Sequence, residues 1–365
     1  MHHKSAPQKV LNSEMNFHDV KTSVQTLAQL KTLKPGSLPG ALIIFTALSR
    51  AKSRQCLAVL PEDIRGRVKN QIERLGDTPE AGSINVFGGI SAQDPDVVLA
   101  VMPEDVSTFS LLGFCRKVSK STVSEHLKNL SIVFDGVKDE ESLADCFGSA
   151  LAARTFQLPL IGKRTEKAKS FQLKDVRFFG SKGAEKSFWL GWHKGNGSNI
   201  VRFLGMLPPN VLDTEEYGKR IQKICKEFGF QFKFYSNKEL KKMGAGAFTA
   251  VDQGDPESHG GIYELTYSPR GAKGKSHVAL VGKGLCFDTG GYDVKTGGWM
   301  LNMKGDMQGS AVALSTMMTA AHLKLPIKLK TFLGVTANHL SPKAYTCDEV
   351  VAVSYTHLTL PTNRE

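Results

Sequence analysis

The sequence lacks the signals of several protein classes. No apolar stretch approaches the length of a membrane-spanning helix, and the opening Met-His-His-Lys-Ser-Ala-Pro-Gln lacks the apolar core of a signal peptide. No nucleotide-binding fingerprint follows a predicted strand, and helix-turn-helix, zinc-finger and RNA-binding signatures are absent. These absences disfavour a membrane partner and make the cytoplasm the expected location.

Paired cysteines are also missing. Because no Cys-x-x-Cys pair occurs, neither a disulfide framework nor a zinc–thiolate site is expected, and the thiols should stay reduced. The six cysteines are scattered along the chain as Cys56, Cys115, Cys146, Cys225, Cys286 and Cys347.

Acidic residues are fewer than basic ones, with 35 Asp and Glu against 47 Lys and Arg, which gives a formal net charge of +12. Basic residues are densest between Lys163 and Lys186, where Phe171, Phe178 and Phe179 are interleaved. Such a segment can bind a nucleic-acid backbone and stack bases. It can equally be a solvated, lysine-rich connection between domains, and this second interpretation is favoured.

The composition, 41% hydrophobic and 22% charged over 365 residues, is that of a globular protein with room for two domains. Strands alternate with helices, which predicts an N-terminal α/β domain with a mostly parallel sheet. In this first part we expect strands at 41–48, 96–102 and 130–134, and helices at 20–33, 64–75 and 140–156. In the second part we expect helices at 214–228, 237–248 and 307–321, and strands at 231–235, 262–267, 277–281 and 327–335.

The most informative stretch runs from Val281 to Asp306. It follows an apolar run and is rich in glycine, lysine and aspartate. Carboxylates crowded on glycine-rich turns repel one another unless a cation lies between them, and a nearby metal ion is a strong reason for a lysine to lose its proton and become a ligand. Ordinary ion pairs in a loop would give the same composition, so spacing alone leaves both interpretations open.

The residue sequence of this stretch resembles that of a known family. Gly-Lys-Gly-Leu-Cys-Phe-Asp-Thr-Gly-Gly-Tyr-Asp-Val-Lys, followed by Met-Lys-Gly-Asp-Met-Gln-Gly-Ser-Ala, is similar to the signature of the leucyl (cytosol) aminopeptidases, a family of two-metal exopeptidases. The resemblance implies that Lys283, Asp288 and Asp306 are metal ligands, that Lys295 is the catalytic lysine, and that Met303 lines the pocket for the substrate's N-terminal side chain.

The same resemblance implies the rest of the chemistry. Two divalent ions, Zn or Mn, would hold the free amine of a peptide and activate water, and the family's hexamers imply a homo-oligomer. The second part of the chain would then be a catalytic domain with a mixed central sheet.

One signature of the family is missing. The run Asn-Thr-Asp-Ala-Glu-Gly-Arg, which supplies further metal ligands and an arginine in that family, does not occur here. The chain follows the family to Val351 and then continues with residues that resemble nothing in it, so we expect a C-terminally truncated catalytic domain with a foreign tail. The expected parts are a flexible segment at 1–35, an α/β domain at 36–160, a basic linker at 161–205, a partial catalytic domain at 206–352 and the tail at 353–365.

These observations favour a metal-dependent aminopeptidase that is inactive, or nearly so, as this shortened chain. Two other functions stay open. One is a catalytically dead homologue that acts as an interaction subunit, and the other is a basic protein that binds nucleic acid.

Overall fold

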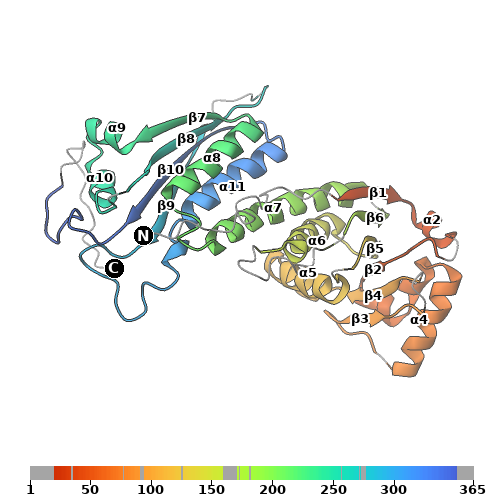
Figure 1. Cartoon of the computed structure of the whole chain (residues 1–365). Helices are drawn as coiled ribbons and strands as arrows, with labels where there is room; N and C mark the ends of the chain where they lie inside the picture. The colour runs from red at the N-terminus through yellow and green to blue at the C-terminus, as the bar shows by residue number, and fades with distance from the viewer. Residues whose placement is uncertain are drawn as a thin grey trace. The chain divides into compact units, whose positions relative to one another are not determined.

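The computed structural model (Figure 1) divides into two compact units, which are described separately. Among the described residues, the first unit comprises those within 20–157 and 171–199, and the second comprises 158 and those within 200–351. The structure describes residues 20–33, 36–76, 78–90, 94–124, 126–158, 171, 173–180, 182–255, 257–270, 272 and 277–351.

The first unit is built on a six-stranded sheet. Its strands lie in the order β1-β6-β5-β2-β4-β3, and every neighbouring pair is parallel except β3 and β4. This confirms the expected mostly parallel sheet. The strands are β1 Lys21–Gln25, β2 Ala41–Thr46, β3 Ile84–Phe87, β4 Asp96–Val101, β5 Asn129–Asp135 and β6 Asp175–Phe179.

Helices cover both faces of this sheet because successive strand residues point to opposite sides. In β2, Ile43 and Phe45 pack with α5, α6 and α7, whereas Leu42 and Ile44 pack with α4 on the other face. The helical segments are α2 Leu27–Lys31, α3 Leu48–Lys52, η1 Gln55–Val59, α4 Glu62–Leu75, α5 Thr108–Thr122, α6 Glu140–Thr155 and α7 Lys182–Met206.

The structure differs from the sequence prediction at both ends of the first unit. The helix expected over 20–33 is instead strand β1 followed by the short helix α2. Residues 161–205 are not only a connection, since they contain β6 and most of α7. Gly191 and Gly195 lie within α7, where they allow the helix to pack closely against α6.

The second unit is built on a four-stranded sheet of order β7-β8-β10-β9. Strand β10 is antiparallel to β8 and parallel to β9, so the expected mixed sheet is confirmed. In Figure 1, α8 and α11 run side by side across one face of this sheet. The elements are α8 Thr214–Phe228, β7 Gln231–Ser236, α9 Asn237–Lys242, α10 Gly246–Asp252, β8 Gly261–Tyr267, β9 His277–Asp288, η3 Met303–Gly305, α11 Gln308–His322 and β10 Lys328–Asn338.

Two boundaries in the second unit depart from the prediction. The helix expected over 237–248 is split into α9 and α10, because Gly244 between them has a φ of +78°. Strand β9 does not end at Val281 but continues to Asp288, since β10 pairs with it along that length. The glycine-rich signature therefore begins inside a strand.

The predicted start of α8 can be tested by one substitution. Asp213 is the N-cap of this helix, and its Oδ1 accepts a hydrogen bond from the backbone N–H of Glu216 at 2.8 Å. We expect Asp213→Ala to lower the free energy of unfolding by about 1 kcal/mol, because that N–H loses its partner. Chemical denaturation should show this loss, and Asp213→Ser should recover most of it.

Candidate metal centre

The paired strands β9 and β10 bring the candidate residues to one end of the sheet. The two strands are parallel, and Asp288, the last residue of β9, lies opposite Asn338, the last residue of β10. Their carboxyl ends therefore meet at the same edge. Open α/β sheets place their binding sites at such an edge.

Glycines on either side of Lys283 explain the Gly-Lys-Gly motif. A Cβ at position 282 would lie 2.5 Å from the Cα of Ser310, and a Cβ at position 284 would lie 2.7 Å from the carbonyl oxygen of Gly334. A side chain at position 282 is excluded because the start of α11 lies directly on β9, and one at position 284 is excluded by the backbone of β10 together with Ser310. This close approach brings Asp306, just before α11, to Lys283.

Lys283 and Asp306 form the first ion pair of the centre. Lys283 Nζ lies 3.0 Å from Asp306 Oδ2, with the lysine side chain 59% exposed and the aspartate side chain 22% exposed. The two groups are close, but their geometry is not that of a hydrogen bond. Oδ2 of Asp306 is shielded from solvent and accepts no hydrogen bond. A shielded carboxylate oxygen without a hydrogen-bond donor is suited to a cation.

Asp288 and Lys295 form the second ion pair, with 3.2 Å between Asp288 Oδ2 and Lys295 Nζ. The other carboxylate oxygen of Asp288 accepts hydrogen bonds from the N–H of Gly290 at 3.0 Å and from Asn338 Nδ2 at 2.8 Å. Burial alone would raise the pKa of Asp288. The hydrogen bonds from Gly290, Asn338 and Lys295 outweigh burial and hold this pKa below its usual range. Asp288 is therefore ionised at neutral pH.

The turn after Asp288 needs glycine. Gly290 and Gly291 have φ values of +91° and +68°, which side chains rarely adopt. The carbonyl of Asn338 accepts hydrogen bonds from the N–H of Thr289 at 2.9 Å and from its hydroxyl at 2.8 Å. The N–H of Lys295 donates to the carbonyl of Thr289 at 2.9 Å. These bonds fold the chain back on itself and return Lys295 to Asp288.

The remaining predicted residue, Met303, opens the short 3-10 helix η3 and is partly buried. Asn302 before it has a left-handed conformation, with a φ of 68°. Lys304 in the same turn donates from Nζ to the carbonyl of Met206 at 3.2 Å, which ties η3 to the end of α7. Met303 therefore lies three residues before Asp306 on an anchored turn.

The donor set decides whether a metal fits. Among the residues that the structure describes, no three His, Cys, Asp or Glu side chains are close enough to hold a metal ion. The available donors are instead two aspartates and two lysines, together with the unsatisfied oxygen of Asp306. A lysine amine binds a metal only without its proton. The carboxylate oxygens of the two aspartates are chemically suited to a divalent cation, and a neutral lysine amine is suited to join them.

Two residues of the site were missed by the sequence prediction. Asn338 holds Asp288, and its signal was its position at the carboxyl end of the strand parallel to β9. Tyr217 on α8 lies 2.8 Å from the hydroxyl of Ser310, and that hydroxyl donates to the carbonyl of Met307 at 2.7 Å. Tyr217 is thus the donor to Ser310, and this pair fixes the start of α11. No sequence pattern indicates that contact.

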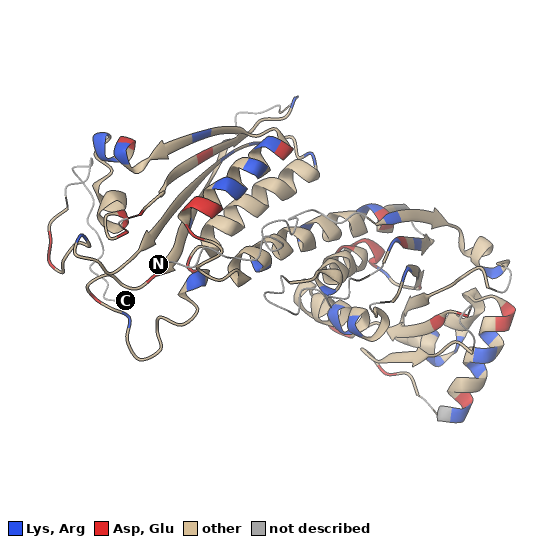
Figure 2. Cartoon of the chain, in the orientation of Figure 1, with Lys and Arg blue, Asp and Glu red and all other residues tan. Residues whose placement is uncertain are grey.

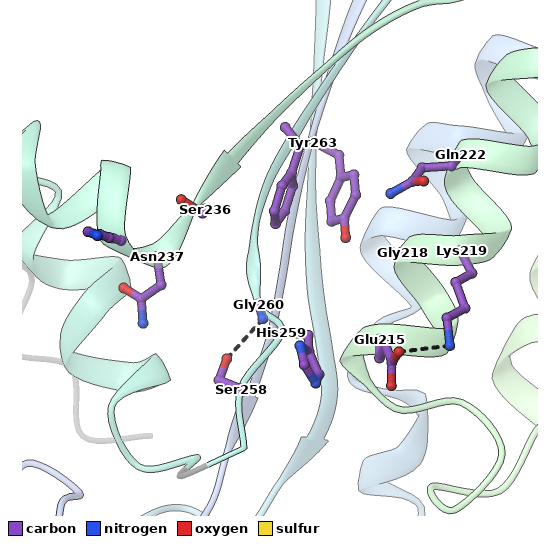
Figure 3. A pocket seen from close by; sticks show the side chains of 12 residues that line it. Glu215, Gly218, Lys219, Gln222, Ser236, Asn237, Ser258, His259, Gly260 and Tyr263 are labelled. Carbon is purple, nitrogen blue, oxygen red and sulfur yellow. Dashed lines mark hydrogen bonds and ion pairs between the residues drawn. The ribbon is translucent and has the colours of Figure 1, made fainter.

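A hollow of about 520 Å³ lies elsewhere in the same unit (Figure 3). It is lined from α8 by Glu215 and Lys219, from β8 by Tyr263, and by Ser258 and His259 before β8. None of the five predicted site residues lines it. The size of this hollow therefore does not identify the reaction centre, and we place the centre at the Lys–Asp pairs.

The residue after Asn338 should make stability depend on pH. His339 Nδ1 lies 3.5 Å from Asp255 Oδ1, and this hydrogen bond raises the pKa of His339 above 6.5 despite partial burial. A histidine with a raised pKa stabilises the fold fully below its unfolded pKa and loses that contribution as pH rises through the folded value. We expect His339→Asn to destabilise the protein more at pH 6 than at pH 8 in urea denaturation. An equal loss at both pH values would contradict the charged pair.

Fold and site together define an α/β protein with a candidate hydrolytic metal centre. Residues 199–359 match the model of the cytosol aminopeptidase family, catalytic domain. A probable cytosol aminopeptidase of Pseudomonas fluorescens is 33% identical over 331 residues, 87% of this chain and 58% of its own length. One from Legionella pneumophila is 25% identical over 288 residues, 79% of this chain and 58% of its own length. Residues 199–359 thus carry the catalytic-domain pattern of the cytosol aminopeptidase family, and the chain is similar to curated members of that family over most of its length.

Solved structures agree in fold. A leucyl aminopeptidase from Trypanosoma cruzi aligns with a TM-score of 0.72 and 19% identity over 96% of this chain and 68% of its own. A tomato leucine aminopeptidase mutant aligns with a TM-score of 0.73 and 14% sequence identity, over 93% of this chain and 67% of its own. The bottromycin maturation enzyme BotP, solved in complex with Mn, aligns with a TM-score of 0.66 and 18% sequence identity, over 86% of this chain and 63% of its own. The chain spans between 28% and 58% of the length of the curated relatives that it matches.

Proposed function

We propose that this protein is a metal-dependent aminopeptidase that removes N-terminal residues from peptides by two-metal hydrolysis. The observation that carries this proposal is the pairing of Lys283 with Asp306 and of Lys295 with Asp288 at the carboxyl ends of β9 and β10. Lysines and aspartates placed in this way are suited to hold divalent cations and to stabilise a developing negative charge.

Each residue then has a role. Lys283, Asp288 and Asp306 would hold the ions, Zn or Mn, whose bound form supplies Lewis acidity and a nucleophilic water. Lys295 stays charged and donates toward the oxygen of the scissile carbonyl, which stabilises the oxyanion. Asn338 orients Asp288 through its 2.8 Å hydrogen bond. Met303 contacts the side chain of the substrate's first residue.

The missing signature limits what these 365 residues can do. Without the Asn-Thr-Asp-Ala-Glu-Gly-Arg run, the chain lacks the further aspartate, glutamate and arginine that the resemblance implies. We therefore propose that the chain as given has little or no peptidase activity. A catalytically dead role as an interaction subunit stays the alternative if no form of the protein carries those residues.

A chimeric protein tests the proposed activity. Residues 352–365 are replaced by the corresponding C-terminal region of the Pseudomonas fluorescens relative, and hydrolysis of leucine p-nitroanilide is measured with added Mn²⁺ or Zn²⁺. We expect the chimera to be active and the original chain to show a hundredfold lower rate or less. N-acetylated substrate should resist cleavage, since the free amine is needed. A folded, metal-loaded chimera without activity would contradict the proposed function.

The nucleic-acid alternative receives little support. Residues 163–170, 172 and 181 of the basic segment from Lys163 to Lys186 lie outside the described residues, so the prediction stays open there. Figure 2 shows basic and acidic residues interspersed along α4 and α8. On α8, Lys219 pairs with Glu215 at 2.8 Å and Lys223 with Glu227 at 3.7 Å. This helix therefore offers no uniform basic face.

Location and assembly follow from the family as proposals. Among the helices that the structure describes, none combines the length and the apolar character needed to cross a membrane. The curated relatives are named cytosol aminopeptidases, which supports a cytoplasmic location. A hexameric homo-oligomer acting on peptides with a free N-terminus is the assembly we propose.

A further inference from the structure

A second cavity lies in the first unit, and none of the proposed metal ligands lines it. It encloses about 300 Å³ at the carboxyl ends of three parallel strands. Ala47 and Leu48 follow β2, Met102 and Pro103 follow β4, and Gly136 and Val137 follow β5, so each strand contributes two residues to the wall. This volume is at the lower end of the range for small-molecule sites.

The cavity lies where the connections between neighbouring parallel strands change from one face of the sheet to the other. From β2 the chain reaches β4 through α4, which packs on one face of the sheet, and it then crosses to β5 through α5, which packs on the other face. The order of strands therefore reverses at β2, between a crossover on one face of the sheet and a crossover on the other. In open α/β sheets, ligands bind in the crevice at such a switch point.

Hydrogen bonds and an ion pair connect the strand ends next to the cavity. Asp135, at the end of β5, accepts two hydrogen-bonded contacts of 2.7 Å from the guanidinium of Arg50 and one of 3.1 Å from the hydroxyl of Thr46. The N–H of Met102 donates to the carbonyl of Thr46 at 2.9 Å. Gly136 has a φ of +68°, and the stem of Arg50 occupies the space that a side chain would need. These contacts fix the ends of β2, β4 and β5 that lead into the cavity wall, and the charge of Arg50 is paired with that of Asp135.

The walls and the rim differ in character. Leu48, Met102, Val106 and Leu111 give apolar walls, whereas Glu104 and Asp139 stand at the rim. The hydrogen bond from the N–H of Ser142 lowers the pKa of Asp139, so it is ionised at neutral pH. Lys138 contributes the only positive charge among the described lining residues. Three further acidic residues, Asp105, Glu140 and Glu141, adjoin the rim in the sequence.

We propose that this crevice binds a small apolar amine, with its hydrocarbon body between the strand ends and its ammonium group at the acidic rim. Apolar walls stabilise the body by removing it from water, and the rim attracts a cation while repelling carboxylates and phosphates. No phosphate-binding glycine fingerprint follows these strands, which agrees with a ligand that is not a nucleotide. This site is independent of the proposed peptidase reaction.

Two probes with the same hydrocarbon body test the proposal. 2-Phenylethylamine and 3-phenylpropionate are titrated into the full 365-residue chain carrying ¹³C-labelled methionine methyl groups. We expect a saturable shift of the Met102 methyl signal with the amine and at least a fivefold weaker response to the carboxylate. The methyl group of Met317, buried on α11 in the other unit, should not move and serves as the internal control.

Two variants separate charge from shape. Glu104→Lys alters an exposed rim residue and should weaken amine binding about fivefold. Ala81→Met places a larger side chain in the cavity and should abolish the Met102 response. Three results would overturn the proposal: no saturable shift of Met102, equal binding of amine and carboxylate, or an undiminished response in Ala81→Met. If Ala81→Met fails to fold, the titration of the wild-type chain and of Glu104→Lys still tests whether the cavity binds the amine.

Discussion

Replacing Lys295 by alanine is expected to lower kcat about a hundredfold in the chimera that carries the complete family signature. The reason is that Lys295 is the cation we assign to the oxyanion. Its Nζ lies 3.2 Å from Asp288 and its side chain is 31% exposed, so it can reach a substrate. Steady-state hydrolysis of leucine p-nitroanilide, with protein saturated in Mn²⁺, measures the effect.

Metal affinity provides the control for this variant. Lys295 competes with a metal ion for the carboxylate of Asp288, so its removal should leave metal binding unchanged or strengthen it. Lys295→Arg keeps the charge and should retain part of the rate. If Lys295→Ala instead loses metal and activity together, Lys295 supports the metal site and does not act on the substrate. An unchanged kcat would remove Lys295 from the mechanism.

Replacing Gly282 by alanine is expected to destabilise the second unit by about 3 kcal/mol. The added methyl group would lie 2.5 Å from the Cα of Ser310 and 2.8 Å from the carbonyl oxygen of Gly309, both backbone atoms of α11. Backbone atoms cannot rotate away as a side chain can, so α11 must move off β9. That movement would also separate Asp306 from Lys283.

Gly305→Ala is the matched control for Gly282→Ala. Its new methyl group would lie 3.4 Å from the end of the flexible Gln308 side chain, which can give way. We expect a change within about 0.5 kcal/mol in chemical denaturation. Equal stability of Gly282→Ala and wild type would show that β9 and α11 are not packed as closely as described here.

The sequence predicted most of the strands, because buried parallel strands such as β2 and β4 read as continuous apolar runs. The sequence prediction failed in the expected linker at 161–205, because glycine is typical of turns but also occurs where two helices pack closely. Gly191 in α7 reads as a turn residue, but it serves helix packing, since a Cβ there would lie 2.7 Å from the carbonyl carbon of Asp145.

The candidate site was predicted in part. Lys283, Asp288, Lys295 and Asp306 were named from the family resemblance, and the structure brings them together as two ion pairs. Their roles stay predictions. Asn338 could not be named because its contact with Asp288 depends on strand register, which local sequence does not fix. The cavity of the first unit was missed for a similar reason, since it depends on the order of strands and has no motif.

The most direct test of the proposed metal centre is to measure Mn²⁺ binding to the chain by isothermal titration calorimetry. If Lys283, Asp288 and Asp306 hold the metal, wild type should bind Mn²⁺, and Asp288→Asn and Asp306→Asn should each weaken binding at least tenfold. Asp293→Asn, an exposed aspartate of the same loop outside the proposed ligand set, should bind as wild type does. Equal binding by all four proteins, or none by wild type, would contradict the metal centre described here.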